Sequence, residues 1–133
     1  MRKIIIDTNF LFIPAQFHVD IYAEMMRICH FPYELCVVDK SMQELEKIAS
    51  RGKTKEAKAA RLSLALAQAK KVTILPSEHI FKNTDDTILE LAQQLDSLVA
   101  TQDIALKRKL KAAQVPLVVL RQKRHLILDG LHS

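Results

Sequence analysis

The sequence predicts an α/β protein, a three-layer α/β/α sandwich around a central parallel sheet of about five strands. Short runs of branched apolar residues, beginning with Ile4-Ile5-Ile6, are typical of strands covered on both faces. Longer segments with helical apolar spacing separate these runs, which is the alternation that parallel strands and crossover helices require. Glycine and proline are rare, with 2 and 4 copies in 133 residues, so we expect a single domain over residues 1–133.

The strands are assigned to apolar runs. They are expected at residues 3–6, 35–38, 72–75, 98–100 and 117–120. Pro76 ends the third strand, because proline has no N–H to donate to a sheet ladder. Right-handed crossovers bring the carboxyl ends of all these strands to one edge of the sheet. Residues 121–133 alternate basic and apolar side chains, and we expect them to pack as a basic tail on a core of residues 3–120.

The helices are assigned from apolar spacing and capping residues. They are expected at residues 19–29, from a cap at Ser41 towards Gly52, from a cap at Thr54 to residue 71, at residues 85–95, and at residues 104–113. Ser41 and Glu44 form the S-x-x-E pattern of a capping box. Asn83 or Thr84 is expected to cap the helix at residues 85–95.

Carboxylates recur where these elements begin or end. Asp7 follows the first strand, Glu44 lies in the first turn of the helix after the second, Asp85 opens the helix before the fourth, and Asp103 lies just beyond the fourth. All these positions fall at the carboxyl edge, where open α/β folds place their sites. Like charges gathered there would raise one another's pKa values, whereas one or two Mg²⁺ or Mn²⁺ ions would turn the repulsion into attraction.

Three of these acids also have an ordinary structural explanation. Glu44 could be only a capping-box partner, Asp85 a first-turn acid favoured by the helix dipole, and Asp103 a helix cap. Asp7 has no such explanation, because no helix is expected directly behind it. The metal hypothesis gains from the coincidence that all the positions share one edge.

Neighbouring residues are expected to support the same site. Thr8, Asn9 and Thr101 offer hydroxyl and amide groups that can orient a carboxylate or a bound water. Asp86 could add to Asp85 or replace it as a ligand, and Asp39 is interpreted as a loop acid.

The charge balance suggests a polyanionic partner. The chain has 20 basic and 15 acidic residues, a net charge of +5, and a pI near 9.3. A basic chain that gathers acids at one point suggests a nucleic acid reached through metal ions. No signal peptide and no apolar stretch of the ~20 residues needed to span a membrane is evident. We therefore expect no membrane contact. Because the two cysteines show no C-x-x-C spacing, we also expect a cytoplasmic protein.

Four motifs in order resemble the PIN-domain family of metal-dependent ribonucleases. They are Ile5-Ile6-Asp7-Thr8-Asn9, Ser41-Met42-Gln43-Glu44-Leu45, Asp85-Asp86-Thr87-Ile88-Leu89 and Ala100-Thr101-Gln102-Asp103. Residues 99–110, with Val115-Pro116-Leu117 after them, are similar to the ribosomal-RNA-processing branch of archaea and eukaryotes. Toxin members of the family, which pair with an antitoxin, share the same acidic centre. The chain lacks the extra metal-binding cysteines of larger members.

The resemblance implies metal-dependent cleavage of RNA that leaves a 5′-phosphate and a 3′-hydroxyl. We expect Asp7, Asp85 and Asp103 to bind Mg²⁺ or Mn²⁺, directly or through water. Glu44 either completes this shell or orients the nucleophilic water. The resemblance also suggests a homodimer, with an antitoxin or a ribosome-assembly factor as partner.

Basic residues near the acidic edge are expected to contact the RNA backbone. They are Lys107, Arg108, Lys109 and Lys111 after Asp103, and Arg121, Lys123 and Arg124 after the last strand. The alternative is a solvated helix face without a partner. If these side chains do bind phosphates, the affinity must fall steeply with added salt.

Other α/β functions fit less well. A phosphoacceptor receiver domain needs an Asp after the third strand, where Leu75 and Pro76 stand, and a dinucleotide binder needs a glycine-rich turn after the first strand. A haloacid-type phosphatase needs a second Asp at the position of Asn9. The serious alternative is a module that keeps the fold and binds RNA without cutting it.

Overall fold

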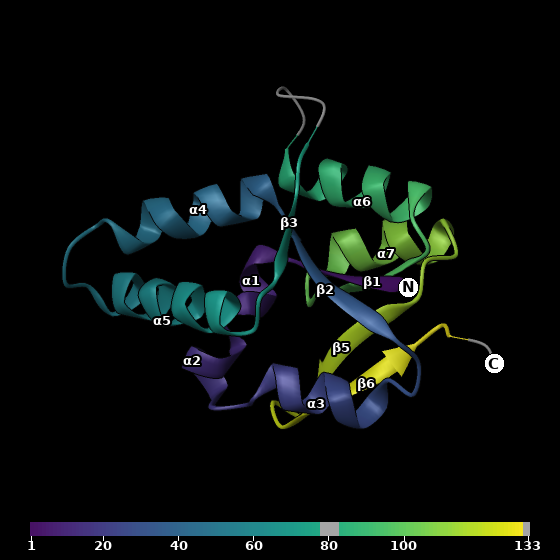
Figure 1. Cartoon of the computed structure of the whole chain (residues 1–133), viewed down its shortest axis with the longest axis horizontal. Helices are drawn as coiled ribbons and strands as arrows, with labels where there is room; N and C mark the ends of the chain where they lie inside the picture. The colour runs from purple at the N-terminus through teal and green to yellow at the C-terminus, as the bar shows by residue number, and fades with distance from the viewer. Residues whose placement is uncertain (78–82, 132–133) are drawn as a thin grey trace.

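The computed structural model describes residues 1–77 and 83–131, and it confirms the predicted α/β sandwich (Figure 1). The strands are β1 (Arg2–Ile6), β2 (Tyr33–Val38), β3 (Thr73–Leu75), β4 (Ser97–Ala100), β5 (Leu117–Arg121) and β6 (His125–Asp129). The helices are α1 (Thr8–Leu11), α2 (Ile13–Phe17), α3 (Ile21–Ile28), α4 (Asp39–Ala49), α5 (Lys55–Ala69), α6 (Thr84–Gln94) and α7 (Ile104–Ala112). Every predicted strand and every predicted helix is therefore present.

The strands form one six-stranded sheet in the order β3-β2-β1-β4-β5-β6. Its pairs are parallel except for β5 and β6, which are antiparallel. In the pairing of β1 with β4, Ile6 lies opposite Ala100. The residues that follow, Asp7 and Thr101, therefore leave the sheet side by side, as the predicted carboxyl edge requires.

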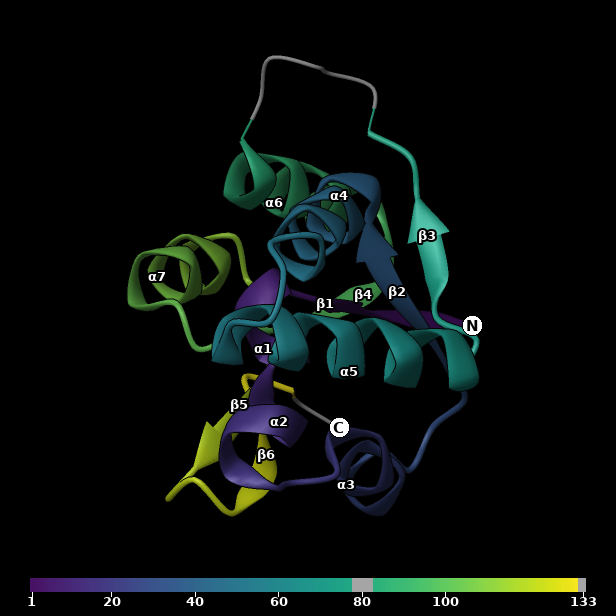
Figure 2. The same ribbon diagram turned by 90° about the vertical axis from the view of Figure 1, so that its left-hand side faces the viewer.

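Apolar residues cover both faces of the sheet because successive side chains of a strand point to opposite faces. On β1, Ile4 and Ile6 pack in a core built with α1 to α5, whereas Ile5 packs in a second core with α6 and α7. Figure 2 shows α6 above β1 and α2, α3 and α5 below it. No helix within residues 1–77 and 83–131 is long and apolar enough to cross a membrane.

The chain beyond residue 120 is not the tail that we predicted, since Arg121 and residues 125–129 belong to the sheet. Arg121 ends β5, a turn follows, and β6 runs back beside β5 with Leu126 fully buried. Gln122 and Lys123 both have positive φ, 57° and 55°, which is the geometry of a type I′ hairpin turn. Such turns usually carry Asn-Gly, so Gln-Lys gave no turn signal. Residues 132 and 133 of the predicted tail lie outside the described part.

The segment after β1 was also misassigned. Two short helices, α1 and α2, occupy residues where no helix was predicted, and the Asp7 carboxylate caps α1. Asp7 therefore does have a structural role directly behind its strand. These helices have four and five residues, which is too few for a helical periodicity to be recognised in the sequence.

The fold makes β6 a test of the corrected assignment. Replacing Leu126 with Ala should lower the free energy of unfolding by about 2–5 kcal/mol, because the side chain is fully buried against the sheet. The matched control is Leu62→Ala on α5, where the side chain is 47% exposed and the expected loss is below about 1 kcal/mol. Urea unfolding followed by circular dichroism measures both, and equal losses would contradict the packing of β6.

Candidate active site

The centre of the candidate site is the Asp7 carboxylate, which is buried at the end of β1 with 5% of the residue exposed. Its Oδ1 accepts a hydrogen bond from the Thr8 N–H at 2.8 Å, and its Oδ2 accepts one from the Thr101 hydroxyl at 2.9 Å. The same hydroxyl accepts a hydrogen bond from the Asp103 N–H at 3.1 Å. Thr101 thus joins the two acids that follow β1 and β4.

Asp103 and Asp85 reach this edge from the first turns of two helices that pack together. Asp103 caps α7, and its Oδ1 accepts a hydrogen bond from the Leu106 N–H at 2.8 Å. Asp85 lies in the first turn of α6, which Asn83 caps. The ordinary explanations for these two acids are therefore correct. They do not exclude a role at the site, since the caps themselves position both carboxylates at the edge.

The electrostatics of the site show that these acids act on one another. Burial is the main cause that raises the pKa of Asp7 from 3.8 to about 6, and the charges of Asp85 and Asp103 add to it. The hydrogen bonds from Thr101 and Thr8 oppose this rise because they favour the ionised form. The pKa of Asp85 is also raised, first by burial and then by the charge of Asp103. Topology has therefore brought acids 96 positions apart into one field (103 minus 7).

Glu44 approaches from α4, but its local setting differs from the prediction. The helix begins at Asp39, so Glu44 lies in its second turn and the predicted capping box with Ser41 is wrong. Ser41 is instead fully buried, and its Oγ accepts a hydrogen bond from the Thr8 hydroxyl at 2.8 Å. This contact holds α4 against the start of α1. Asp39 is not a loop acid either, because it is the first residue of α4. Its Oδ2 accepts a hydrogen bond from the Ser77 N–H at 3.0 Å.

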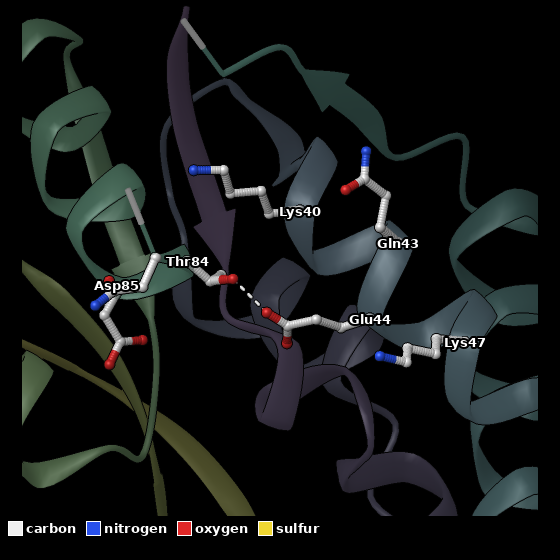
Figure 3. A pocket seen from close by; sticks show the side chains of 7 residues that line it. Lys40, Gln43, Glu44, Lys47, Thr84 and Asp85 are labelled. Carbon is white, nitrogen blue, oxygen red and sulfur yellow. Dashed lines mark hydrogen bonds between the residues drawn. The ribbon is translucent and has the colours of Figure 1, made fainter. Parts of the chain in front are cut away.

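A pocket lies between α4 and α6, and Glu44 stands on its wall. The Glu44 carboxylate accepts a hydrogen bond from the Thr84 hydroxyl across this pocket (Figure 3). The pocket has a volume of about 630 Å³ and is lined by Lys40, Gln43, Glu44, Lys47, Asn83, Thr84 and Asp85. The charge of Glu44 contributes to the raised pKa of Asp85, which makes Glu44 part of the same acidic group.

The predicted supporting residues separate in the structure. Thr101 binds Asp7 as described, and Thr8 does so through its N–H while its hydroxyl binds Ser41. Asn9 instead lines a different pocket, between α1, α2, α4 and α5.

Asp86 lies beside Lys109 on α7, with 3.8 Å between Oδ1 and Nζ. The charge of Asp86 raises the pKa of Asp85.

The predicted RNA-binding cations also divide into groups. Lys109 and Lys111 stand beside acids, Lys111 at 3.0 Å from Asp129. Lys123 lies over the ring of Phe17, 5.5 Å from its centroid. Lys107 and Arg108 belong to the first turns of α7, directly after Asp103, and Arg121, Lys123 and Arg124 are exposed around the β5–β6 turn.

One positioning residue was missed because nothing in the sequence signals it. The side-chain amide of Gln102 donates to the Leu120 carbonyl at 3.2 Å and accepts from the Leu120 N–H at 2.8 Å. It therefore continues the pairing of β4 with β5 by a side chain after β4 has ended. This contact holds the segment that carries Thr101 and Asp103, and no sequence pattern distinguishes such a glutamine from a surface one.

The donor chemistry of the site fits a hard divalent cation. Its charged donors are carboxylates, the oxygen ligands that Mg²⁺ and Mn²⁺ prefer, and a cation would relieve the burial and like-charge repulsion at Asp7. Within residues 1–77 and 83–131, no three acidic, histidine or cysteine side chains stand ready to hold one ion together.

Comparison with known protein families gives a match over most of the chain. A family model described as "PIN like domain" matches residues 4–123. Ribonuclease VapC4 of Methanocaldococcus jannaschii is 29% identical over 132 residues, which is 98% of this chain and 99% of that protein. The rRNA-processing protein fcf1 of Schizosaccharomyces pombe is 31% identical over 109 residues. These cover 81% of this chain but 53% of that protein, so the chain spans about half the length of this relative.

A solved structure gives the same result for the fold. The structure titled for the PIN domain endonuclease Utp24 superposes with a TM-score of 0.78 at 26% identity, and it covers 97% of this chain and 92% of the other. The matched range 4–123 includes every acid of the candidate site.

The raised pKa of Asp7 makes a prediction about stability and pH. The folded protein holds this proton with a pKa of about 6 against an ordinary 3.8, so folding stability should fall as pH rises through that window. In metal-free buffer, Asp7→Asn should therefore become more stable than the parent as pH rises from 4 to 7, by up to about 3 kcal/mol. Below pH 4 the gain should vanish.

Chemical unfolding at several pH values, with a chelator present, measures this difference. The control is Asp96→Asn, which removes an exposed carboxylate 3.5 Å from Arg2 at the start of β4. Its difference from the parent should change little over the same range. If the difference in unfolding free energy between Asp7→Asn and the parent did not change with pH, the pKa of Asp7 would not be raised in the folded protein.

Proposed function

The chain belongs to the PIN-like domain family, and from this premise we propose that it is a divalent-metal-dependent ribonuclease that hydrolyses RNA phosphodiester bonds. The observation that carries the proposal is the buried Asp7 carboxylate, which binds the Thr101 hydroxyl and lies in the field of Asp85 and Asp103. The names of the VapC4 and Utp24 relatives support ribonuclease and endonuclease chemistry.

We assign Asp7, Asp85 and Asp103 to holding Mg²⁺ or Mn²⁺, as one ion or two. An ion bound there would lower the pKa of a coordinated water and would stabilise the charge that develops on the phosphate. Thr101 keeps the Asp7 carboxylate oriented through its hydroxyl and keeps Asp103 close through the Asp103 N–H. Glu44, held by Thr84, completes the shell or orients the attacking water. The proposed contacts to the RNA backbone remain the basic residues of α7 and of the β5–β6 turn. They are Lys107, Arg108, Arg121, Lys123 and Arg124, with the ion-paired Lys109 and Lys111.

Two biological roles follow from the two kinds of relative. Ribosomal-RNA processing is supported by the match to fcf1, which is named an rRNA-processing protein. The toxin role is implied by the resemblance to toxin members of the family, and the match to ribonuclease VapC4, whose length this chain nearly equals, is compatible with it. The proposed partners accordingly are RNA, a second copy of the chain, and either an antitoxin or a ribosome-assembly factor. An adjoining small antitoxin reading frame would favour the toxin.

We propose a cytoplasmic location, since Cys29 and Cys36 are both free thiols.

Cleavage of labelled single-stranded RNA tests the proposed chemistry. The parent should cut RNA in Mn²⁺, a chelator should abolish cutting, and Asp7→Asn or Asp103→Asn should slow it by roughly 100-fold or more. Asn is also a good helix cap, so Asp103→Asn removes the charge while keeping the start of α7.

The Asp96→Asn variant is again the matched control and should cut at the parent rate. Undiminished cutting by Asp7→Asn would point to a contaminant or to another centre. RNA binding without any metal-dependent cutting by the parent would favour the non-catalytic binding module.

A further inference from the structure

The pocket between α4 and α6 shares Glu44 and Asp85 with the acidic centre, yet its other charged walls are basic. We propose that this pocket holds the sugar-phosphate backbone of an unpaired RNA strand beside the cleavage site, with Lys40 and Lys47 as its phosphate contacts. The inference rests on the proposed ribonuclease function and names residues outside the acidic centre and the predicted cationic stretches.

The two lysines stand on one face of α4. Lys40, Gln43, Glu44 and Lys47 follow the spacing i, i+3, i+4, i+7, which places their side chains along one stripe of a helix. Figure 3 shows Lys40 and Lys47 on either side of Glu44, with both ammonium ends directed towards the α6 side of the pocket. A rise of 1.5 Å per residue puts them about 10 Å apart along the axis, so they can contact different phosphates of one strand.

The two ammonium groups differ in how they are held. The Lys40 Nζ donates to the Thr87 hydroxyl on α6 at 3.1 Å, which keeps it at the mouth of the pocket. Lys47 is exposed, and within residues 1–77 and 83–131 its ammonium makes no hydrogen bond or ion pair. Both line the pocket together with the Glu44 and Asp85 carboxylates. Basic side chains here attract a polyanion that the acids alone would repel.

The chemistry of the pocket walls favours an unpaired strand. The volume of about 630 Å³ is large enough to admit a nucleotide. A single strand can turn its sugars and base edges towards side chains, whereas a duplex keeps its bases stacked and paired. The amides of Gln43 and Asn83 on the walls can hydrogen-bond a sugar or base without the aromatic platform that this chain lacks.

Binding in chelator, where cutting is switched off, tests the pocket separately from catalysis. A short labelled single-stranded RNA should bind Lys47→Ala on the order of five-fold more weakly than the parent at moderate salt. The slope of log affinity against log salt should also fall by about 0.7. The double variant with Lys40→Ala should lose further affinity, with thermal melting as the check on folding because Lys40 contacts Thr87.

The matched control is Lys70→Ala, which removes the same charge at the end of α5, where the chain enters β3 at the opposite edge of the sheet. Its affinity should stay within two-fold of the parent. Equal losses in Lys47→Ala and Lys70→Ala would overturn the pocket as a site, and so would a duplex of the same sequence that binds as tightly as the single strand. A parent that binds RNA through Lys47 but never cuts it would overturn the ribonuclease proposal alone.

Discussion

The parallel pairing of β1 with β4 is the constraint on which the site depends. Because Ile6 lies opposite Ala100, the next residues are Asp7 and Thr101, and the hydroxyl of one reaches the carboxylate of the other at 2.9 Å. A slip of one residue would turn the side chains of the strand to the opposite face and separate this pair. A slip would also move Lys3 or Asp7 into the buried stretch that Ile4 and Ile6 fill on one face and Ile5 on the other. The hydrophobic pattern therefore sets the geometry of the acids.

The same constraint creates an electrostatic cost. Asp7 caps α1 and accepts two hydrogen bonds, but these do not outweigh its burial and the charges of Asp85 and Asp103, so its pKa rises to about 6. Burial of this carboxylate beside other acids lowers the stability of the fold at neutral pH, where the side chain would otherwise ionise freely. A bound cation would remove that cost by stabilising the ionised form. The burial that is unfavourable for the fold alone is therefore favourable for the proposed metal site.

The sequence was sufficient for the five parallel strands and for the placement of three acids at their carboxyl ends, because both follow from long-range regularities. Apolar runs located the five parallel strands, and the topology rule placed Asp7, Asp85 and Asp103 at one edge. It was insufficient where the structure depends on one contact. The turn at Gln122 and Lys123 adopts positive φ without glycine or asparagine, and the Gln102 amide imitates a strand partner. The start of α4 moved to Asp39, which changed Ser41 from a cap into a buried partner of Thr8.

The acids and the proposed substrate contacts differ in how firmly the fold holds them. Asp7, Thr101 and Asp103 are joined by hydrogen bonds at the end of the central strands, so their geometry cannot change without disturbing the sheet. Lys47 is an exposed residue on one helix face, and no core residue depends on it. Substitution there alters the charge of the pocket while leaving both cores intact. Changes on α4 can therefore alter the proposed RNA contacts without disturbing the acids at the sheet edge.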